Sequence, residues 1–161
     1  MGKTKETFEL YSNQILNLAG TIPVMERLSS PHITITKRSK MCGAKVTIDL
    51  KLSREIVIDY AHDVRACALG QASASILAKD IIGKTTHQII FVRNSVVKML
   101  NGSEYSENIF QDYHILSAAS QFKNRHESIL LALEATVEAI ETLNVTKEIP
   151  LKTTLDSQKD R

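Results

Sequence analysis

Several features that would narrow the function are scarce in this chain of 161 residues. It has no tryptophan, only four tyrosines and four phenylalanines, and no stripe of basic residues interleaved with aromatic side chains. Such a stripe is the usual signature of a surface that neutralises phosphates and stacks on bases. The formal net charge of +2 is too small to indicate a polyanionic partner by itself. We therefore expect no nucleic-acid partner.

Long apolar runs are also missing. No run approaches the roughly 20 residues that cross a bilayer, and the first seven residues lack the apolar core of a secretory signal. A hydrophobic content of 43% is enough for one globular domain with a sizeable core. The sequence thus predicts a cytoplasmic protein with no membrane partner.

Cysteine is equally scarce, because the chain contains only Cys42 and Cys67. In a reducing compartment, two cysteines are better explained as reactive thiols, metal ligands or core residues than as a structural disulfide. The sequence has no HExxH, CxxC, glycine-rich phosphate loop or G-x-S-x-G elbow. Four histidines share no spacing with a partner motif and are predicted to be solvated or hydrogen-bonded at the surface: His32, His62, His87 and His114.

Hydrophobic periodicity predicts one helix followed by three strands in the first part of the chain. Residues 6–19 have the helical period. After Pro31 the apolar period changes to two, which is typical of half-buried strands. The strands are expected around residues 33–35, 46–52 and 56–60. Short connections, including a turn at Ser53-Arg54, favour an antiparallel meander.

Only helices are expected beyond residue 65. An Ala- and Ser-rich helix over residues 67–82 is ended by Gly83, and Thr85 and Gln88 have the spacing of a capping box. The helices that follow are expected over residues 89–100, 112–119 and 124–143.

The order of these elements predicts an α+β fold. An N-terminal helix precedes a three-stranded antiparallel sheet, and several helices then pack on one face of the sheet. Residues 1–144 are expected to form this domain. Residues 145–161 contain a proline, alternating charges and few apolar side chains, so we expect a disordered tail there.

Both cysteines lie where a thiolate is favoured. Cys42 precedes Gly43 in a basic loop that includes Lys40 and Lys45. Cys67 begins a predicted helix, where unpaired N–H groups carry partial positive charge. A thiolate binds soft metals and carries sulfur. The alternative for each cysteine is a small apolar core residue, since free cysteine is among the most buried residue types.

Three segments of the chain resemble the U-type iron-sulfur cluster assembly scaffold family, which includes the NifU N-terminal domain, IscU and SufU. They are Met41-Cys42-Gly43, the stretch from Asp63 to Ser75 around Cys67, and Arg125-His126. The resemblance extends from about Leu10 to Leu143. The segment around Cys67 is its most specific part.

The resemblance implies an iron-sulfur cluster assembly scaffold or carrier, and not an enzyme with turnover. Such a protein accepts sulfur from a cysteine desulfurase, builds a transient [2Fe-2S] cluster or holds iron, and passes the cluster to apo iron-sulfur client proteins. The family's ligands are three cysteines, an aspartate two positions after the first cysteine and, in many members, a histidine before the third. Carried over to this chain, the first two cysteines match Cys42 and Cys67, and the histidine matches His126.

The chain departs from the family at two ligand positions. Ala44 stands where the family has aspartate, and Glu127 stands where it has the third cysteine. A carboxylate is a harder ligand than a thiolate for iron-sulfide chemistry. Cysteine, histidine and glutamate are all normal zinc ligands, so the candidate metal site comprises Cys42, Cys67, His126 and Glu127. Because His126 and Glu127 are consecutive on a helix and point about 100° apart, joint binding of one metal needs a distorted helix start.

Three functions follow from these residues. The first is a scaffold in which Cys42 and Cys67 hold iron or zinc and receive sulfur. The second is a zinc-binding or regulatory protein that keeps the fold but no longer builds clusters. The third is a thiol redox protein in which the two cysteines form a reversible disulfide, which requires a short Cα separation. His126 and Glu127 also have structural interpretations, since an acidic residue in a first helical turn complements the helix dipole.

Overall fold

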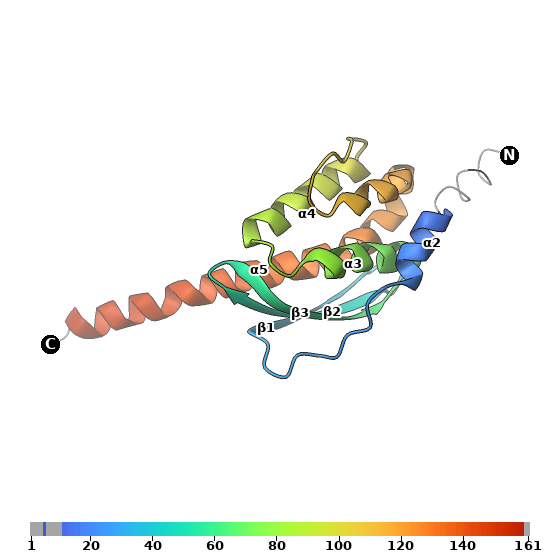
Figure 1. Ribbon diagram of the computed structural model, residues 1–161. Helices are drawn as coiled ribbons and strands as arrows, with labels where there is room; N and C mark the ends of the chain where they lie inside the picture. The colour runs from blue at the N-terminus through green and yellow to red at the C-terminus, as the bar shows by residue number, and fades with distance from the viewer. Residues whose placement is uncertain (1–4, 6–10, 160–161) are drawn as a thin grey trace.

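The computed structural model describes residue 5 and residues 11–159 and has the predicted α+β architecture (Figure 1). The elements, in chain order, are α2 (Asn13–Gly20), β1 (Ile33–Arg38), β2 (Lys45–Ser53), β3 (Ile56–Arg65), α3 (Ala68–Asp80), α4 (Thr86–Leu100), the 3-10 helix η1 (Gln111–Gln121) and α5 (Lys123–Lys159). The part of the expected first helix over residues 6–10 lies outside the described residues.

The three strands form an antiparallel meander in the order β1-β2-β3, as the short connections predict. Lys45 at the start of β2 pairs with Arg65 at the end of β3. The β2–β3 turn lies at Arg54 and Glu55, one residue later than expected, and their φ angles are +48° and +64°. Two successive positive φ angles are typical of the type I′ turn, whose twist matches that of the flanking strands.

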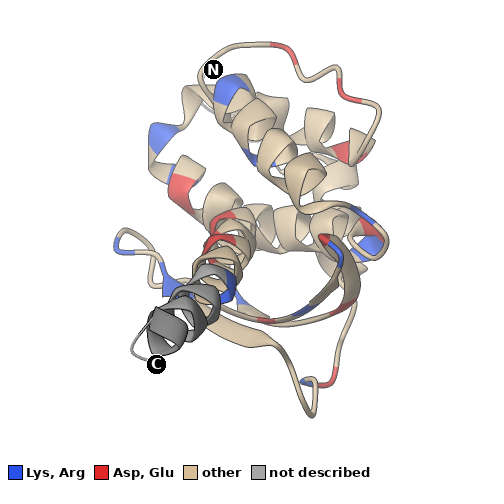
Figure 2. Ribbon diagram, turned by 90° about the vertical axis from the view of Figure 1, so that its left-hand side faces the viewer, with Lys and Arg blue, Asp and Glu red and all other residues tan. Residues whose placement is uncertain are grey.

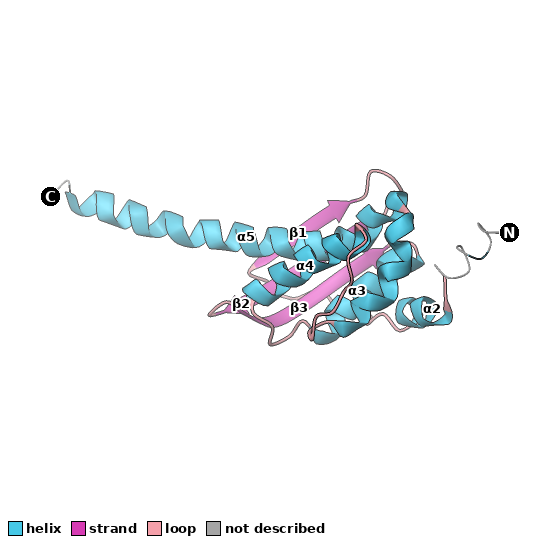
Figure 3. Cartoon of the chain, turned by 90° about the horizontal axis from the view of Figure 1, so that it is seen from above, coloured by secondary structure: helices cyan, strands magenta, loops and turns pink. Residues whose placement is uncertain are grey.

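Helices cover one face of the sheet, which confirms the predicted layering. Helix α5 packs on β1 and β2, α3 packs on β3, and α2 packs on α3. Helix α4 and η1 lie above α3 and α5 as a further layer (Figures 1 and 3). The apolar positions of β2 face the helices and are buried: Val46, Ile48, Leu50 and Leu52.

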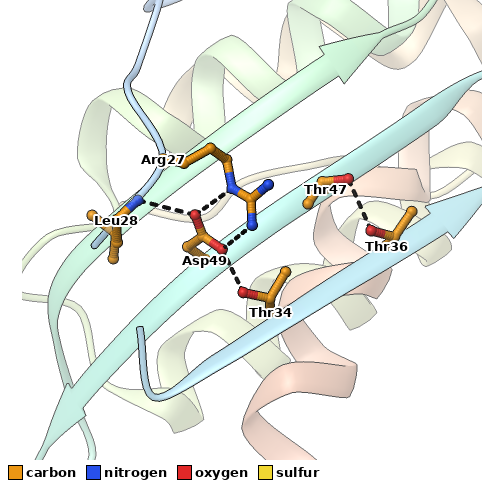
Figure 4. A network of polar contacts seen from close by, with 6 residues as sticks. All are labelled: Arg27, Leu28, Thr34, Thr36, Thr47 and Asp49. Carbon is orange, nitrogen blue, oxygen red and sulfur yellow. Dashed lines mark hydrogen bonds and ion pairs between the residues drawn. The ribbon is translucent and has the colours of Figure 1, made fainter. Parts of the chain in front are cut away.

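Asp49 lies on the opposite face of the sheet, where the alternation of β2 predicts exposed side chains. Asp49 is fully buried because the segment between α2 and β1 crosses this face. Arg27 donates to its carboxylate from two nitrogens, at 2.5 and 2.8 Å (Figure 4). The Leu28 N–H and the Thr34 hydroxyl donate to the same carboxylate. These donors replace the water that an ionised group loses on burial.

His62 also differs from the expectation of a surface histidine. Its exposed fraction is 4%, and its Nε2 lies 2.8 Å from the Pro23 carbonyl oxygen. The reason is again the segment after α2, which runs beside β3. Burial lowers the pKa of His62, while the Pro23 carbonyl and the charge of Asp63 act in the opposite direction.

Local signals set the helix boundaries. Cys67 is the N-cap residue of α3. At α4 the predicted capping box is confirmed, since the Thr85 hydroxyl accepts the Gln88 N–H and the Gln88 side chain accepts the Thr85 N–H. Gly83 and Gly102 follow α3 and α4 with φ angles of +85° and +105°. Glycine adopts such angles without the strain that a side chain imposes.

Helix α5 continues to Lys159, whereas the sequence predicts disorder from residue 145. The segment contains no glycine, and its lysine, leucine and glutamine residues favour helix, although the helix passes through Pro150, which lacks an N–H. The core nevertheless ends near Leu143, and Val145 is exposed. Beyond the sheet, α5 projects away from the other elements (Figures 1 and 3).

Charges of both signs are interspersed along the ribbon seen down α5 (Figure 2). One exposed ion pair joins the sheet to this helix, between Lys37 Nζ and Glu138 Oε2 at 2.8 Å. In the part of the chain that the structure describes, no helix combines the length and apolarity that crossing a bilayer requires.

Candidate functional site

The strand register brings both cysteines to the same end of the sheet. Because Lys45 pairs with Arg65, the loop before β2 and the residues after β3 lie side by side. Cys42 belongs to that loop, and Cys67 follows β3 by two residues. The antiparallel meander therefore brings two cysteines that are distant in the sequence to neighbouring positions in space.

Ser128, near the start of α5, lies beside the thiol site. Its Oγ is 3.4 Å from Cys67 Sγ, and its hydroxyl is also among the groups that lower the pKa of Cys42. Ser128 is only 3% exposed. Cys42 is exposed and Cys67 is half-buried. The two cysteines therefore lie near the start of α5, where Cys67 Sγ contacts a buried hydroxyl and Cys42 is open to solvent.

The Cys42 loop, residues 39–44, is a compact connection between β1 and β2. The Ser39 N–H donates to the Ala44 carbonyl at 2.8 Å and closes the loop. Gly43 has a φ of +70°, which glycine tolerates without strain. The Cys42 N–H donates to Ser39 Oγ at 3.4 Å, and Cys42 Sγ lies 3.3 Å from the same oxygen. Ser39 and Ala44 are buried at the base of the loop, below the exposed tip.

Hydrogen bonds hold the pKa of Cys42 below its ordinary value. The Ser39 hydroxyl contributes most, followed among the lowering causes by the Ala44 backbone N–H and the Ser128 hydroxyl. Partial burial and the negative charge of Glu127 oppose this shift. The thiolate is therefore favoured, as the sequence predicts. The cause differs, because these hydrogen-bond donors replace the basic residues invoked from the sequence.

His126 and Glu127, in the first turns of α5, have protein partners in different directions. Glu127 Oε1 accepts the Lys40 N–H of the Cys42 loop at 2.9 Å. His126 Nε2 lies 3.0 and 3.2 Å from the carbonyl oxygens of Ala119 and Ser120 in η1. That nitrogen is the donor in both contacts, since a carbonyl only accepts.

A resident metal ion does not fit this arrangement of donors. No three His, Cys, Asp or Glu side chains converge as a metal site among residues 11–147. The position of the family's aspartate is occupied by the buried methyl group of Ala44. A structural zinc ion takes four ligands. The four predicted ligands therefore have separate partners in this structure: Cys42 contacts Ser39, Cys67 contacts Ser128, Glu127 accepts the Lys40 N–H, and His126 donates to carbonyl oxygens of η1.

Comparison with known proteins places the chain in a family. The model of the NifU-like N terminal domain matches residues 11–129, which include Cys42, Cys67 and Ser128. The chain belongs to the NifU-like N-terminal domain family. The resemblance noted in the sequence is therefore confirmed at the level of the family.

Relatives of this NifU-like domain match it over most of their length. The iron-sulfur cluster assembly scaffold protein IscU of Thermotoga maritima is 24% identical over 135 residues, which cover 84% of this chain and 95% of that protein. The zinc-dependent sulfurtransferase SufU of Bacillus subtilis is 27% identical over 104 residues, or 64% of this chain and 71% of that protein. A solved structure of a nitrogen-fixing NifU-like protein (N-terminal) from Brucella abortus is 34% identical, with a TM-score of 0.84, and the match covers 86% of this chain and 97% of that chain.

Sequence reasoning missed the two serines of the site. Ser39 precedes Cys42 by three residues in a short loop, a spacing from which its hydroxyl contact could have been suspected. Ser128 is 61 residues from Cys67, and no local pattern connects them. Both act through hydrogen bonds to sulfur, so a search for metal-ligand residue types passes over them.

Proposed function

We propose that this NifU-like domain is an iron-sulfur cluster assembly scaffold that carries its cargo on Cys42 and Cys67. The observation that carries the proposal is that the strand register brings the exposed Cys42 and the half-buried Cys67 to one end of the sheet, beside the start of α5. Membership of the NifU-like family and relatives named as scaffold proteins support it. The cargo is iron and sulfide that enter and leave, so a permanent ligand cage is not required.

Cys42 is the proposed sulfur acceptor, because it is exposed and its pKa is lowered. Its thiolate attacks the outer sulfur of a persulfide on a cysteine desulfurase. A bond forms between Cys42 Sγ and that sulfur while the donor's sulfur–sulfur bond breaks, and the donor cysteine leaves as a thiolate. The exchange needs no oxidant or reductant, because the electrons balance.

Two thiolates suit a transient [2Fe-2S] cluster. A permanently held cluster of this type takes four cysteine thiolates. This domain supplies two, so the other positions are open to small thiols or to cysteines of an apo client protein. Of the two other predicted ligands, His126 Nε2 is bonded to carbonyl oxygens of η1, while Glu127 Oε1 is bonded to the Lys40 N–H.

Anaerobic reconstitution with iron, sulfide and a small thiol tests the proposal. The wild-type chain is expected to develop visible charge-transfer absorption, and Cys42→Ser and Cys67→Ser are each expected to abolish it. Ser53→Ala, at the exposed last residue of β2 and thus at the other end of that strand from the Cys42 loop, is the matched control and should behave as wild type. A colourless wild-type product with a folded circular dichroism spectrum would reject the scaffold function.

The second proposal is a regulatory or zinc-binding protein of the same fold that no longer builds clusters; zinc binding would require His126 or Glu127 to leave its present partner. Ala44 and Glu127 at two ligand positions favour it, as does the relative named a zinc-dependent sulfurtransferase. Elemental analysis of protein purified without added metal separates the two functions, since stoichiometric zinc that iron does not displace supports only this one. Thiol titration after mild oxidation examines the disulfide alternative in the same samples.

A further inference from the structure

We propose that Glu127 is a positioning residue that holds the Cys42 loop against α5, and that it does not bind the cargo. The carboxylate Oε1 accepts the backbone N–H of Lys40 at 2.9 Å, between residues 87 positions apart. A hydrogen bond to an ionised acceptor is stronger than a neutral one. The consequence for cargo rests on the proposed scaffold function, whereas the contact itself does not.

Between its buried ends at Ser39 and Ala44, the Cys42 loop has few other attachments to the rest of the domain. Its remaining backbone hydrogen bonds in the described structure join Ser39 to Ala44 and Cys42 to Ser39, both within the loop. The tip side chains are exposed, with Met41 at 68%, so they contribute little packing. The bond from Glu127 is thus the one described hydrogen bond that links the loop backbone to α5.

Glu127 and Ser128 act on the same loop from adjacent positions of one helical turn. Successive helical side chains point about 100° apart. One residue therefore reaches the Lys40 backbone while the next contacts Cys67 Sγ. A loop that is ordered in advance presents Cys42 beside Cys67 without the entropy cost of ordering it during cargo binding.

A carboxylate suits this role better than the cysteine that the family has at this position. Sulfur is a weak hydrogen-bond acceptor, whereas an ionised carboxylate is a strong one. The carboxylate is also a harder ligand than a thiolate for iron-sulfide chemistry. Replacement of the third cysteine by Glu127 therefore removes a soft ligand and adds a contact that fixes the loop.

Amide hydrogen exchange at Lys40 in the full chain tests the contact. Glu127→Ala removes the acceptor, and Glu127→Gln keeps an acceptor oxygen but removes the charge. We expect exchange at Lys40 to be about tenfold faster in Glu127→Ala and within about threefold of wild type in Glu127→Gln. Glu138→Ala, which removes the α5 carboxylate that binds Lys37, is the matched control and should leave exchange at Lys40 unchanged.

Cluster formation in the same variants tests the consequence. The initial rate should fall several-fold in Glu127→Ala and recover in Glu127→Gln, a rescue that general loss of stability would not produce. Glu127→Met, which keeps the side-chain length without an acceptor, serves as a second variant if Glu127→Ala unfolds. Equal exchange at Lys40 in wild type and the acceptor-free variants overturns the proposal, and so does exchange in Glu127→Gln as fast as in Glu127→Ala. If exchange follows the expected pattern while wild type forms no cluster, the scaffold function fails and the positioning contact stands.

Discussion

A Cβ atom on Gly70 would lie 2.6 Å from the Ser128 hydroxyl oxygen and 2.7 Å from the Ala66 Cβ. Glycine at this position therefore allows α3 and α5 to approach closely where Ser128 contacts Cys67. The Ser128 hydroxyl is able to rotate, but the Ala66 methyl group is fixed to the backbone and has no such freedom. The contact between Ser128 and Cys67 therefore depends on the absence of a side chain at Gly70.

We expect Gly70→Ala to lower the free energy of unfolding by about 1–3 kcal/mol, because overpacking outweighs the gain of about 1 kcal/mol in helix propensity. Gly20→Ala is the matched control, since nothing lies within 4 Å of its added Cβ. Urea unfolding of both variants measures the difference. Equal stability of the two variants would show that α3 and α5 can separate without cost.

Ser39→Ala should raise the pKa of Cys42 toward its ordinary value, because the Ser39 hydroxyl is the main cause of the lowered value. Alkylation of Cys42 near neutral pH should then slow by roughly threefold to tenfold, since the thiolate is the reactive form. Mass spectrometry of the Cys42 peptide against pH measures the rate. Ser53→Ala provides the control, and an unchanged profile in Ser39→Ala would assign the shift to other groups.

Asp49→Asn should lower the free energy of unfolding by about 1–3 kcal/mol, because Arg27 and Thr34 lose an ionised buried partner. Burial alone would raise the pKa of Asp49, but the hydrogen bonds from Arg27, Thr34 and the Leu28 N–H lower it overall. The stability that this carboxylate contributes is thus present above about pH 4, the ordinary pKa, and is lost as the pH falls through the lowered folded-state pKa.

Chemical denaturation between pH 7 and pH 3 measures that prediction. The wild-type chain should lose more stability on acidification than Asp49→Asn does. Asp59→Asn, at an exposed position of β3, is the control and should keep the wild-type slope. Parallel curves for wild type and Asp49→Asn would mean that the carboxylate is not the titrating group.

Protonation of His62 should lower the free energy of unfolding on mild acidification. Burial lowers its pKa in the folded state, so the unfolded chain binds the proton more readily. The contribution is fully present above about pH 6.5 and declines as the pH falls below that value. His62→Phe should flatten the stability curve between pH 7 and pH 5, whereas His87→Gln, at an exposed position of α4, should not. Thermal unfolding at several pH values compares the three chains, and a slope retained in His62→Phe would contradict the assignment.

Much of the fold could be predicted because its signals are local. The period of two between Ile33 and Tyr60 identified the strands, and the spacing of Thr85 and Gln88 identified a capping box. The burial of Asp49 and His62 could not be predicted in this way. Both are covered by the segment after α2. The apolar–polar alternation of a strand does not show whether a distant segment covers its polar face.

The two cysteines could be found from the sequence, because their residue type and flanking motifs are visible there. The contact of Ser128 with Cys67 could not, since Ser128 reaches that sulfur only when α5 packs against α3 beside Gly70. Glu127 shows the same limit. Its residue type is compatible with a metal ligand, but its bond to the Lys40 N–H depends on where the β1–β2 loop lies relative to α5.

By itself, the sequence determined the order of helices and strands, the α+β class and the choice of Cys42 and Cys67, because periodicity, caps and rare residue types are properties of short segments. Only the tertiary structure decided which groups face the sulfurs and which carboxylate holds the loop. Those contacts join residues as far as 87 positions apart. Their geometry follows from packing, which no short segment encodes alone.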